Sequence, residues 1–199
     1  YLVPESRYDE MVDALAASGV HAVVVTPAHQ FPTGAVTSPA RRHALLKWAR
    51  SYGGLVLEDD YDAEFRYDRT PIGALQGLGP DVVLYGGSVS KTLAPGLRVG
   101  YVVASKTVIR KLVLMKQAAD LHSSSINQIA ITHVAERHFE AQVAKIRKAY
   151  SARRDAMLAA LEREMAGLGV HWNSPQGGMF LWLRLPEGLD ATALLPQAV

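Results

Sequence analysis

Residues 88–100 read Ser-Val-Ser-Lys-Thr-Leu-Ala-Pro-Gly-Leu-Arg-Val-Gly, and they are the stretch that decides the fold. They follow the apolar run 81–85, which is typical of a buried strand, so they form a loop at the carboxyl end of that strand. The polar side chains of this loop are those of Ser88, Ser90, Lys91 and Arg98. Sheets of alternating strands and helices bind ligands beyond the carboxyl ends of their strands, so we treat this loop as a candidate site.

Two other interpretations of this loop have to be considered. A phosphate-binding P-loop also follows a strand, but it requires glycine directly before its lysine and a helix directly after it. Here Ser90 precedes Lys91, and Pro95-Gly96 would break the required helix within its first turns. The other alternative is that Lys91 is an ordinary solvated lysine, because nearly all lysines are exposed.

Two further apolar runs also end in polar segments. Residues 21–27, His-Ala-Val-Val-Val-Thr-Pro, predict a buried strand that leads into the loop 26–34. Residues 55–57 lead directly into the acidic string 58–62, Glu-Asp-Asp-Tyr-Asp, which alone would suit a polar loop or a divalent-cation site. Since all three polar segments follow strands of one inferred sheet, a shared ligand site is favoured.

The remaining pattern predicts an α/β fold with a largely parallel sheet and helices on both faces. A further strand is expected at 99–103, and a hairpin of 170–172 with 179–183 opens a second unit. Helices are expected at 8–17, at 39–52 with Ser38 as N-cap and Gly53-Gly54 at the end, and along 106–165 with a break near 123–125. A last helix begins near the end of the chain.

The composition excludes several classes of protein. With 49% hydrophobic and 20% charged residues the chain is globular, and 21 basic against 19 acidic residues give no single-sign field for nucleic acid or a membrane surface. The absence of cysteine excludes disulfides, zinc-thiolate sites and cysteine nucleophiles. No apolar run approaches the roughly 20 residues of a membrane span, and no secretory signal is present, so a soluble cytoplasmic protein is expected.

Three segments, in this order along the chain, resemble the fold-type I aminotransferases of class I/II, which use pyridoxal phosphate (PLP). They are the Pro-Thr-Gly loop at 32–34, the acid-plus-tyrosine strand end at 58–61 and the lysine motif at 88–100. The strings His-Gln-Phe-Pro-Thr-Gly at 29–34 and Glu-Asp-Asp-Tyr-Asp-Ala-Glu-Phe at 58–65 are most similar to the aminotransferase-like domains of MocR-type regulators, a branch of the GntR transcription factors. The similarity covers essentially the whole chain.

The resemblance implies a cofactor role for each candidate residue. The family lysine that matches Lys91 forms an imine with the PLP aldehyde and serves as general base once an incoming amine displaces it. Asp59 would pair with the pyridine nitrogen, and Tyr61 would donate a hydrogen bond to the phenolate oxygen. The choice of Asp59 over Asp60 follows from the Asp-x-Tyr spacing of this branch.

Phosphate binding is assigned by the same resemblance. Arg98 would hold the phosphate bidentately, and Ser88 and Ser90 would add hydroxyl contacts. One departure concerns the asparagine that many members carry directly before the Pro-Thr-Gly loop, where it contacts the phenolate oxygen. Phe31 occupies that position here, which leaves His29 and Gln30 as candidate substitutes.

The family also predicts the organisation of the protein. Residues 1–145 would form part of a three-layer large domain of the PLP-dependent transferase type, with a mixed, mostly parallel sheet. Residues 146–199 would be a connecting helix and the start of a small α+β C-terminal domain. Members run to roughly twice this length, beyond the usual single-domain size, so a fragment is expected.

Two functions are compatible with these residues. The first is the effector-sensing domain of a MocR-type regulator, which binds PLP and an amine or amino acid, acts as a homodimer and contacts DNA only through a separate winged-helix domain. The second is a catalytic aminotransferase, which moves an amino group from an amino acid to a 2-oxo acid. Both use the same cofactor residues.

Overall fold

The computed structural model describes residues 8–68 and 72–198. Their elements, in chain order, are α1 (Tyr8–Ser18), β1 (Ala22–Val25), α2 (Pro39–Tyr52), β2 (Leu55–Asp60), η2 (Leu75–Gly77), β3 (Val83–Ser88), η3 (Pro95–Leu97), β4 (Gly100–Val103), α3 (Lys106–Asp120), α4 (Ser125–Met165), β5 (His171–Trp172), β6 (Leu183–Arg184) and α5 (Ala191–Ala198). None of these helices has the length and apolar character that a bilayer crossing requires.

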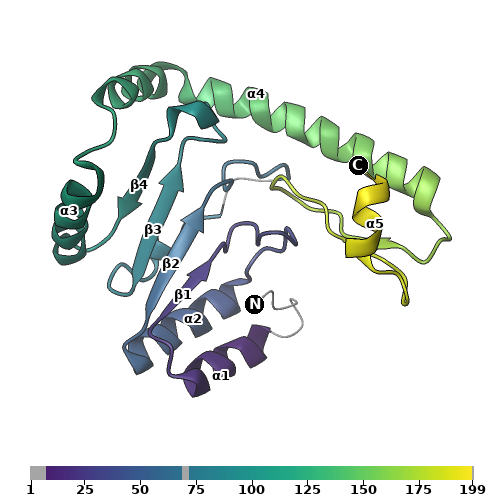
Figure 1. The fold of residues 1–199 in the computed structure, drawn as a ribbon, viewed down its shortest axis with the longest axis horizontal. Coiled ribbons are helices and arrows are strands. Elements are labelled where there is room, and N and C mark those ends of the chain that lie inside the picture. The colour runs from purple at the N-terminus through teal and green to yellow at the C-terminus, as the bar shows by residue number, and fades with distance from the viewer. Residues whose placement is uncertain (1–7, 69–71, 199) are drawn as a thin grey trace.

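The larger sheet has the strand order β1-β2-β3-β4. β1, β2 and β3 run parallel, with Val23 opposite Val56 and Val56 opposite Val83. β4 returns antiparallel to β3. The expected α/β class with a mixed, mostly parallel sheet is therefore confirmed, and the carboxyl ends of β1, β2 and β3 meet at one edge of the sheet (Figure 1).

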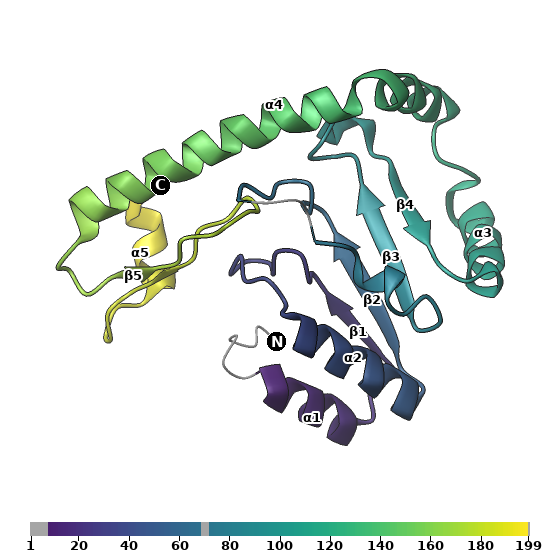
Figure 2. The same cartoon turned by 180° about the vertical axis from the view of Figure 1, so that it is seen from behind.

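One face of this sheet packs on α2, and α1 packs on α2 in turn (Figure 2). The hydrophobic core between them includes Leu45 and Trp48 of α2 with Val56 and Val83 of the sheet. The helix begins as predicted, because Ser38 accepts a hydrogen bond from the backbone N–H of Arg41 and Pro39 occupies the first turn. It ends at Gly53, whose φ of 64° is the left-handed conformation that glycine adopts without strain.

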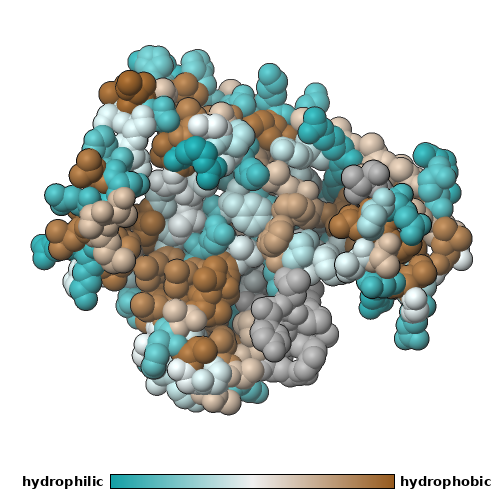
Figure 3. Space-filling model, in the orientation of Figure 1, coloured by the Kyte–Doolittle hydropathy of each residue, from teal (hydrophilic) through white to brown (hydrophobic). Residues whose placement is uncertain are grey.

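The opposite face of the sheet is open in the described residues. Val24 is 66% exposed and Val102 is 48% exposed, and a hydrophobic area covers the strands in this view (Figure 3). The prediction that 21–27 forms a buried strand is therefore wrong for this structure: β1 lies at the sheet edge, and its alternate side chains face the open side. A β-branched run predicts a strand, but it does not say whether both faces are covered.

α4 is a 41-residue helix that runs from above the sheet to a second unit, which contains β5, β6 and α5 (Figure 1). The predicted helix break is confirmed, since α3 ends at Asp120 and α4 begins at Ser125. The predicted boundary between residues 145 and 146 falls inside α4 and stays a prediction. The predicted hairpin forms from β5 and β6, but residues 179–182 are not part of its second strand.

A short segment of the second unit pairs with the loop after β2. Gly178 donates its N–H to the carbonyl of Phe65 (2.9 Å), and Tyr67 donates its N–H to the carbonyl of Gln176 (2.9 Å). These bonds flank an antiparallel bridge between Arg66 and Gly177. The loop after β2 and the loop before β6 are thereby held side by side near the carboxyl ends of the parallel strands.

Candidate functional site

A pocket of about 690 Å³ opens at the carboxyl ends of the parallel strands, and we call it the strand-end pocket. Its wall includes Gln30, Phe31, Asp59, Tyr61, Lys91 and Phe180. The loops after β1, β2 and β3 each contribute to it, as expected from the sequence. The structure therefore brings Asp59, Tyr61 and Lys91 together around one cavity of the size that small-molecule ligands occupy.

The two neighbouring aspartates at the end of β2 face opposite ways. Asp59 lines the strand-end pocket. Asp60 accepts hydrogen bonds from the Tyr85 hydroxyl (2.9 Å) and from the backbone N–H of Ala63 (3.0 Å). Of the two carboxylates, Asp59 is therefore the one that can meet a ligand, in agreement with the choice made from the Asp-x-Tyr spacing.

The electrostatic environment of Asp59 is unfavourable for a bare carboxylate. Burial raises its pKa above the ordinary value, and the charge of Asp62 raises it further. A cation bound beside Asp59 would offset both effects. The pocket therefore has a place where a positively charged ring nitrogen is electrostatically favoured.

Tyr61 lies on the pocket wall with its hydroxyl 3.2 Å from the carbonyl oxygen of His29, to which it donates. Burial, followed by the charge of Asp62, raises its pKa well above the ordinary value of tyrosine. The side chain is therefore a neutral hydrogen-bond donor at physiological pH. This is the form that could donate to an oxyanion of a ligand.

The residues predicted to bind phosphate lie at the end of β3 and on the loop after it, outside the wall of the strand-end pocket. The Ser88 hydroxyl donates to the Ser90 hydroxyl oxygen (2.8 Å) and accepts from the Ser90 backbone N–H (3.0 Å), so the two serines form a local turn. Arg98 follows η3 with φ of 51° and has an exposed side chain. Ser88 ends β3, and Ser90 and Arg98 lie with Lys91 in the segment between β3 and β4. Their phosphate role stays a prediction.

The whole chain matches one protein family. The model for "Aminotransferase class I and II" matches residues 5–196. The chain belongs to this family. Its fold and its assignment to a PLP-dependent family, both expected from the sequence, are therefore confirmed.

Relatives of this aminotransferase-family chain include both enzymes and regulators. Aromatic-amino-acid aminotransferase 1 of Thermococcus litoralis is 38% identical over 96% of this chain and 46% of its own length. An uncharacterized HTH-type transcriptional regulator of Bacillus subtilis, YdfD, is 33% identical over 87% of this chain and 36% of its own length. The chain thus spans about half the length of the curated aminotransferases it matches.

A solved structure of the family is closely similar to this fold. LysN, an alpha-aminoadipate aminotransferase from Thermus thermophilus, superposes with a TM-score of 0.88 at 34% identity. The match covers 98% of this chain and 50% of LysN. That structure holds N-(5'-phosphopyridoxyl)-L-leucine, a conjugate of the cofactor with an amino acid.

The structure distinguishes between His29 and Gln30, the two candidate substitutes for the family asparagine. The His29 side chain is 2% exposed and its Nδ1 lies 2.9 Å from Asp62 Oδ1, away from the pocket. Gln30 lines the pocket, and its Oε1 accepts a hydrogen bond from the Thr33 hydroxyl (2.8 Å). Of these two residues, only Gln30 is positioned to contact a ligand in the strand-end pocket.

Sequence reasoning missed three residues near the site. Phe180 lines the pocket from the second unit and meets Phe31 edge-on, with ring centroids 5.2 Å apart. Asp62 pairs with His29, and the buried Arg66 donates to Gln176 Oε1 (2.6 Å). A buried pairing between residues 33 or 110 positions apart leaves no periodic signal in a single sequence.

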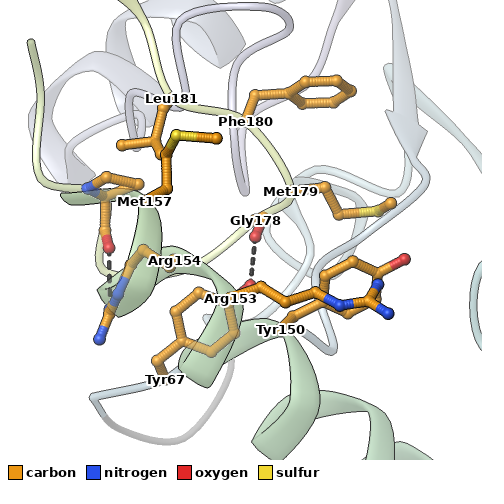
Figure 4. A pocket seen from close by; sticks show the side chains of 10 residues that line it. Tyr67, Tyr150, Arg153, Arg154, Met157, Gly178, Met179, Phe180 and Leu181 are labelled. Atoms are coloured by element: carbon orange, nitrogen blue, oxygen red, sulfur yellow. Dashed lines mark hydrogen bonds between the residues drawn. The ribbon is translucent and has the colours of Figure 1, made fainter. Parts of the chain in front are cut away.

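A second, smaller pocket of about 200 Å³ lies between α4 and the segment 175–181 (Figure 4). The Arg154 guanidinium stacks 4.8 Å above the Tyr67 ring and donates to the carbonyl of Pro175 (3.0 Å). Phe180 belongs to the walls of both pockets. In the described part of the chain, no cluster of His, Cys, Asp or Glu side chains is arranged to hold a metal ion.

Proposed function

We propose that this chain binds PLP in the strand-end pocket through an imine with Lys91 and is the effector-sensing domain of a MocR-type regulator. The observation that carries the cofactor assignment is that Lys91, Asp59 and Tyr61 line one cavity. An amine from the segment after β3, and a carboxylate and a neutral phenol from the end of β2, therefore converge on the same space. These are the three groups that the aldehyde, ring nitrogen and phenolate oxygen of PLP require.

The pocket suits this cofactor in its chemistry and its size. Burial and the neighbouring Asp62 make the charge of Asp59 costly, so a protonated pyridine nitrogen would stabilise it. Tyr61 is held neutral and can turn its hydroxyl from the His29 carbonyl toward a ligand oxygen. When bound, PLP supplies an electron sink for an amine substrate.

The contacts to the other parts of the cofactor are assigned to individual residues of the chain. Lys91 supplies the amine that holds the cofactor and accepts a proton after an incoming amine takes its place. Asp59 keeps the ring nitrogen protonated, and Tyr61 orients the phenolate oxygen. Ser88, Ser90 and Arg98 are assigned to the phosphate, since they lie at the end of β3 and in the segment after it, which carries Lys91.

The sensor assignment rests on the regulator relatives and on the strings at 29–34 and 58–65, which resemble MocR-type domains. In this role an amine or amino acid displaces Lys91, the domain changes conformation, and a separate winged-helix domain transmits the change to DNA. We infer a homodimeric, cytoplasmic whole protein. The homologues at 33–37% identity that are named as HTH-type regulators support this assignment.

A catalytic aminotransferase is the alternative. It is supported by the identity of 38% to the Thermococcus enzyme and 35% to the 2-aminoadipate transaminase of Thermus thermophilus. Both functions share every cofactor residue, so they differ in turnover and in the attached domain. An amine ligand that changes the spectrum without releasing product indicates a sensor, whereas transfer of the amino group to a 2-oxo acid indicates an enzyme.

The cofactor assignment is tested by absorbance of the whole protein loaded with PLP. An imine gives a band in the visible region that borohydride bleaches, and Lys91→Ala is expected to abolish it. Lys116→Ala is the matched control, because Lys116 lies on α3 and its amine binds Asp120 at the surface. An unchanged band in a folded Lys91→Ala protein would refute the assignment. The same samples, incubated with an amino acid and a 2-oxo acid, decide between sensor and enzyme.

A further inference from the structure

A buried histidine–aspartate pair lies directly behind the wall of the strand-end pocket. His29 and Asp62 are 2% and 1% exposed, and His29 Nδ1 lies 2.9 Å from Asp62 Oδ1. The other polar atoms of both side chains, His29 Nε2 and Asp62 Oδ2, are buried without a hydrogen-bond partner in the described structure. Buried polar atoms without partners lower the stability of a fold, so a contribution to stability does not account for this pair.

The second unit closes over this pair. A Cβ atom at position 177 would lie 2.5 Å from His29 Nε2, and one at 178 would lie 3.0 Å from His29 Cγ and 3.2 Å from Asp62 Oδ2. The backbone of Gly177 and Gly178 therefore packs directly on the ring and the carboxylate. Asp62 thus binds Nδ1 of the His29 ring, while the backbone of Gly177 packs near Nε2 and that of Gly178 near Cγ.

The backbone of His29 leads directly to the cofactor-facing residues. Its carbonyl oxygen accepts the hydrogen bond from Tyr61 (3.2 Å), and the next two residues, Gln30 and Phe31, line the strand-end pocket. Tyr61 itself directly precedes Asp62 in the chain. The pair thus connects the loop after β1 and the loop after β2 at the point where both reach the pocket.

From this arrangement we propose that His29 and Asp62 are positioning residues that hold the Tyr61 side chain at the pocket wall, where its hydroxyl can turn to the cofactor. The inference deepens the proposed function and rests on it. With the His29 ring held between Asp62 and the Gly177–Gly178 backbone, the loop after β1 is tied to the residue that directly follows Tyr61, so the Tyr61 oxygen keeps its place when its proton turns from the His29 carbonyl to a ligand. Without the pair, the loop after β1 is free to shift, and the Tyr61 hydroxyl loses its defined position.

The charged and titratable groups around the pair come from the end of β2, the loop after it and α4. The charge of Asp62 acts on five of them: Asp59, Asp60, Tyr61, Glu64 and Tyr67. Arg147 of α4 donates to the Glu64 carbonyl, and Arg66 follows in the same loop. Substituting either residue also changes the charge that these groups experience, because Asp62 without the His29 donor is a buried carboxylate that has lost its partner. A shift caused by that charge would add to the shift of Tyr61→Phe, and His29→Asn keeps a donor for Asp62, so substitutions at His29 separate the two causes.

The test measures the pH midpoint of the visible PLP band in the whole protein. His29→Leu keeps the approximate volume and removes the Nδ1 donor, while His29→Asn keeps a donor near the Nδ1 position. Glu58→Gln is the matched control, since Glu58 is 3% exposed on the other face of β2 and accepts the backbone N–H groups of Leu75 and Gln76. Tyr61→Phe gives the shift that results from losing the hydroxyl itself.

We expect His29→Leu to move the midpoint in the same direction as Tyr61→Phe, by at least half as much, and His29→Asn to restore most of it. Because the pair acts through Tyr61, the double variant should shift no further than Tyr61→Phe alone. A His29→Leu midpoint equal to that of Glu58→Gln would overturn the inference, and so would a shift that adds fully to that of Tyr61→Phe. Absence of the band from the unmodified protein would instead overturn the proposed function.

Discussion

Residue 177 shows how a single missing Cβ atom shapes this site. A Cβ there would lie 2.5 Å from His29 Nε2 and 2.8 Å from the carbonyl oxygen of Phe65, and the second of these is a backbone atom that cannot rotate away. We expect Gly177→Ala to lower the free energy of unfolding by about 1–3 kcal/mol, the usual cost of overpacking. Urea denaturation of the two proteins measures the difference.

Gly77→Ala is the control for that substitution. Gly77 lies in η2, and a Cβ atom there would have no neighbour within 4 Å. We expect a change within about 0.5 kcal/mol, as for most surface substitutions. Equal effects of the two alanines would show that the close approach of the second unit to His29 is not what requires glycine.

The residues that line the strand-end pocket were predictable one by one, whereas the buried residues that pack behind them were not. Lys91, Asp59 and Tyr61 follow strands whose carboxyl ends meet, so their order along the chain already indicates a shared pocket. The choice between His29 and Gln30 depends on which way the backbone turns after β1. In a single sequence both residues are polar side chains in the same loop, and only the packing of Asp62 and the second unit decides between them.

Among the secondary-structure elements, local sequence signals predicted the ends of helix α2 but not the length of the second hairpin strand. α2 begins and ends where its serine, proline and glycine signals predicted. The second strand of the hairpin is shorter than its apolar run, because the Asn173 side-chain oxygen accepts a hydrogen bond from the Trp182 backbone N–H (2.7 Å). The side-chain amide of Asn173 also donates to the Thr33 carbonyl (2.6 Å). A side chain thus replaces one strand-pairing bond and ties the hairpin to the Pro-Thr-Gly loop.

The cap of α2 offers a test at this scale. Ser38 accepts the backbone N–H of Arg41 (3.4 Å) at the start of the helix that carries Leu45 and Trp48 into the core. We expect Ser38→Ala to lower the free energy of unfolding by about 1 kcal/mol, because one N-terminal N–H loses its partner. Thermal unfolding followed by far-UV circular dichroism measures the loss.

The same helix supplies the control. Ser51 is exposed in the last turn of α2, so Ser51→Ala removes an equivalent hydroxyl without a capping role. Alanine has a higher helix propensity than serine, and we expect this variant to be unchanged or slightly more stable. If Ser51→Ala were as destabilising as Ser38→Ala, the cap would not be the cause.

At the scale of the whole molecule, α4 spans the distance between the sheet and the second unit (Figure 1). Two of its arginines bind backbone carbonyls on the way: Arg147 donates to Glu64 (2.8 Å and 3.0 Å) and Arg154 to Pro175 (3.0 Å). Together with the bridge between Arg66 and Gly177, these bonds hold the second unit at the carboxyl edge of the sheet. Phe180 consequently lines the same strand-end pocket as Tyr61, although it lies 119 positions later in the sequence.

The open face of the sheet has a consequence for the behaviour of the 199-residue chain by itself. Val24 is 66% exposed and Leu57 is 37% exposed, and the two are neighbours in register on adjacent strands. A hydrophobic area is visible on one face of the molecule (Figure 3). Exposed apolar surfaces of this kind bind hydrophobic dyes and promote association. We expect the chain to enhance the fluorescence of such a dye and the Val24→Thr/Leu57→Thr variant to enhance it less.

Threonine keeps the β-propensity of the strands, so the double variant should retain its fold. Its free energy of unfolding should change little, because Val24 and Leu57 already contact solvent. Val56→Thr is the opposite case: this side chain is fully buried against α2, and a hydroxyl there loses its hydration without gaining an assured partner. That variant should unfold at a lower urea concentration and bind more dye. Unchanged dye binding by Val24→Thr/Leu57→Thr would mean that the dye is bound elsewhere and that this face is covered in solution.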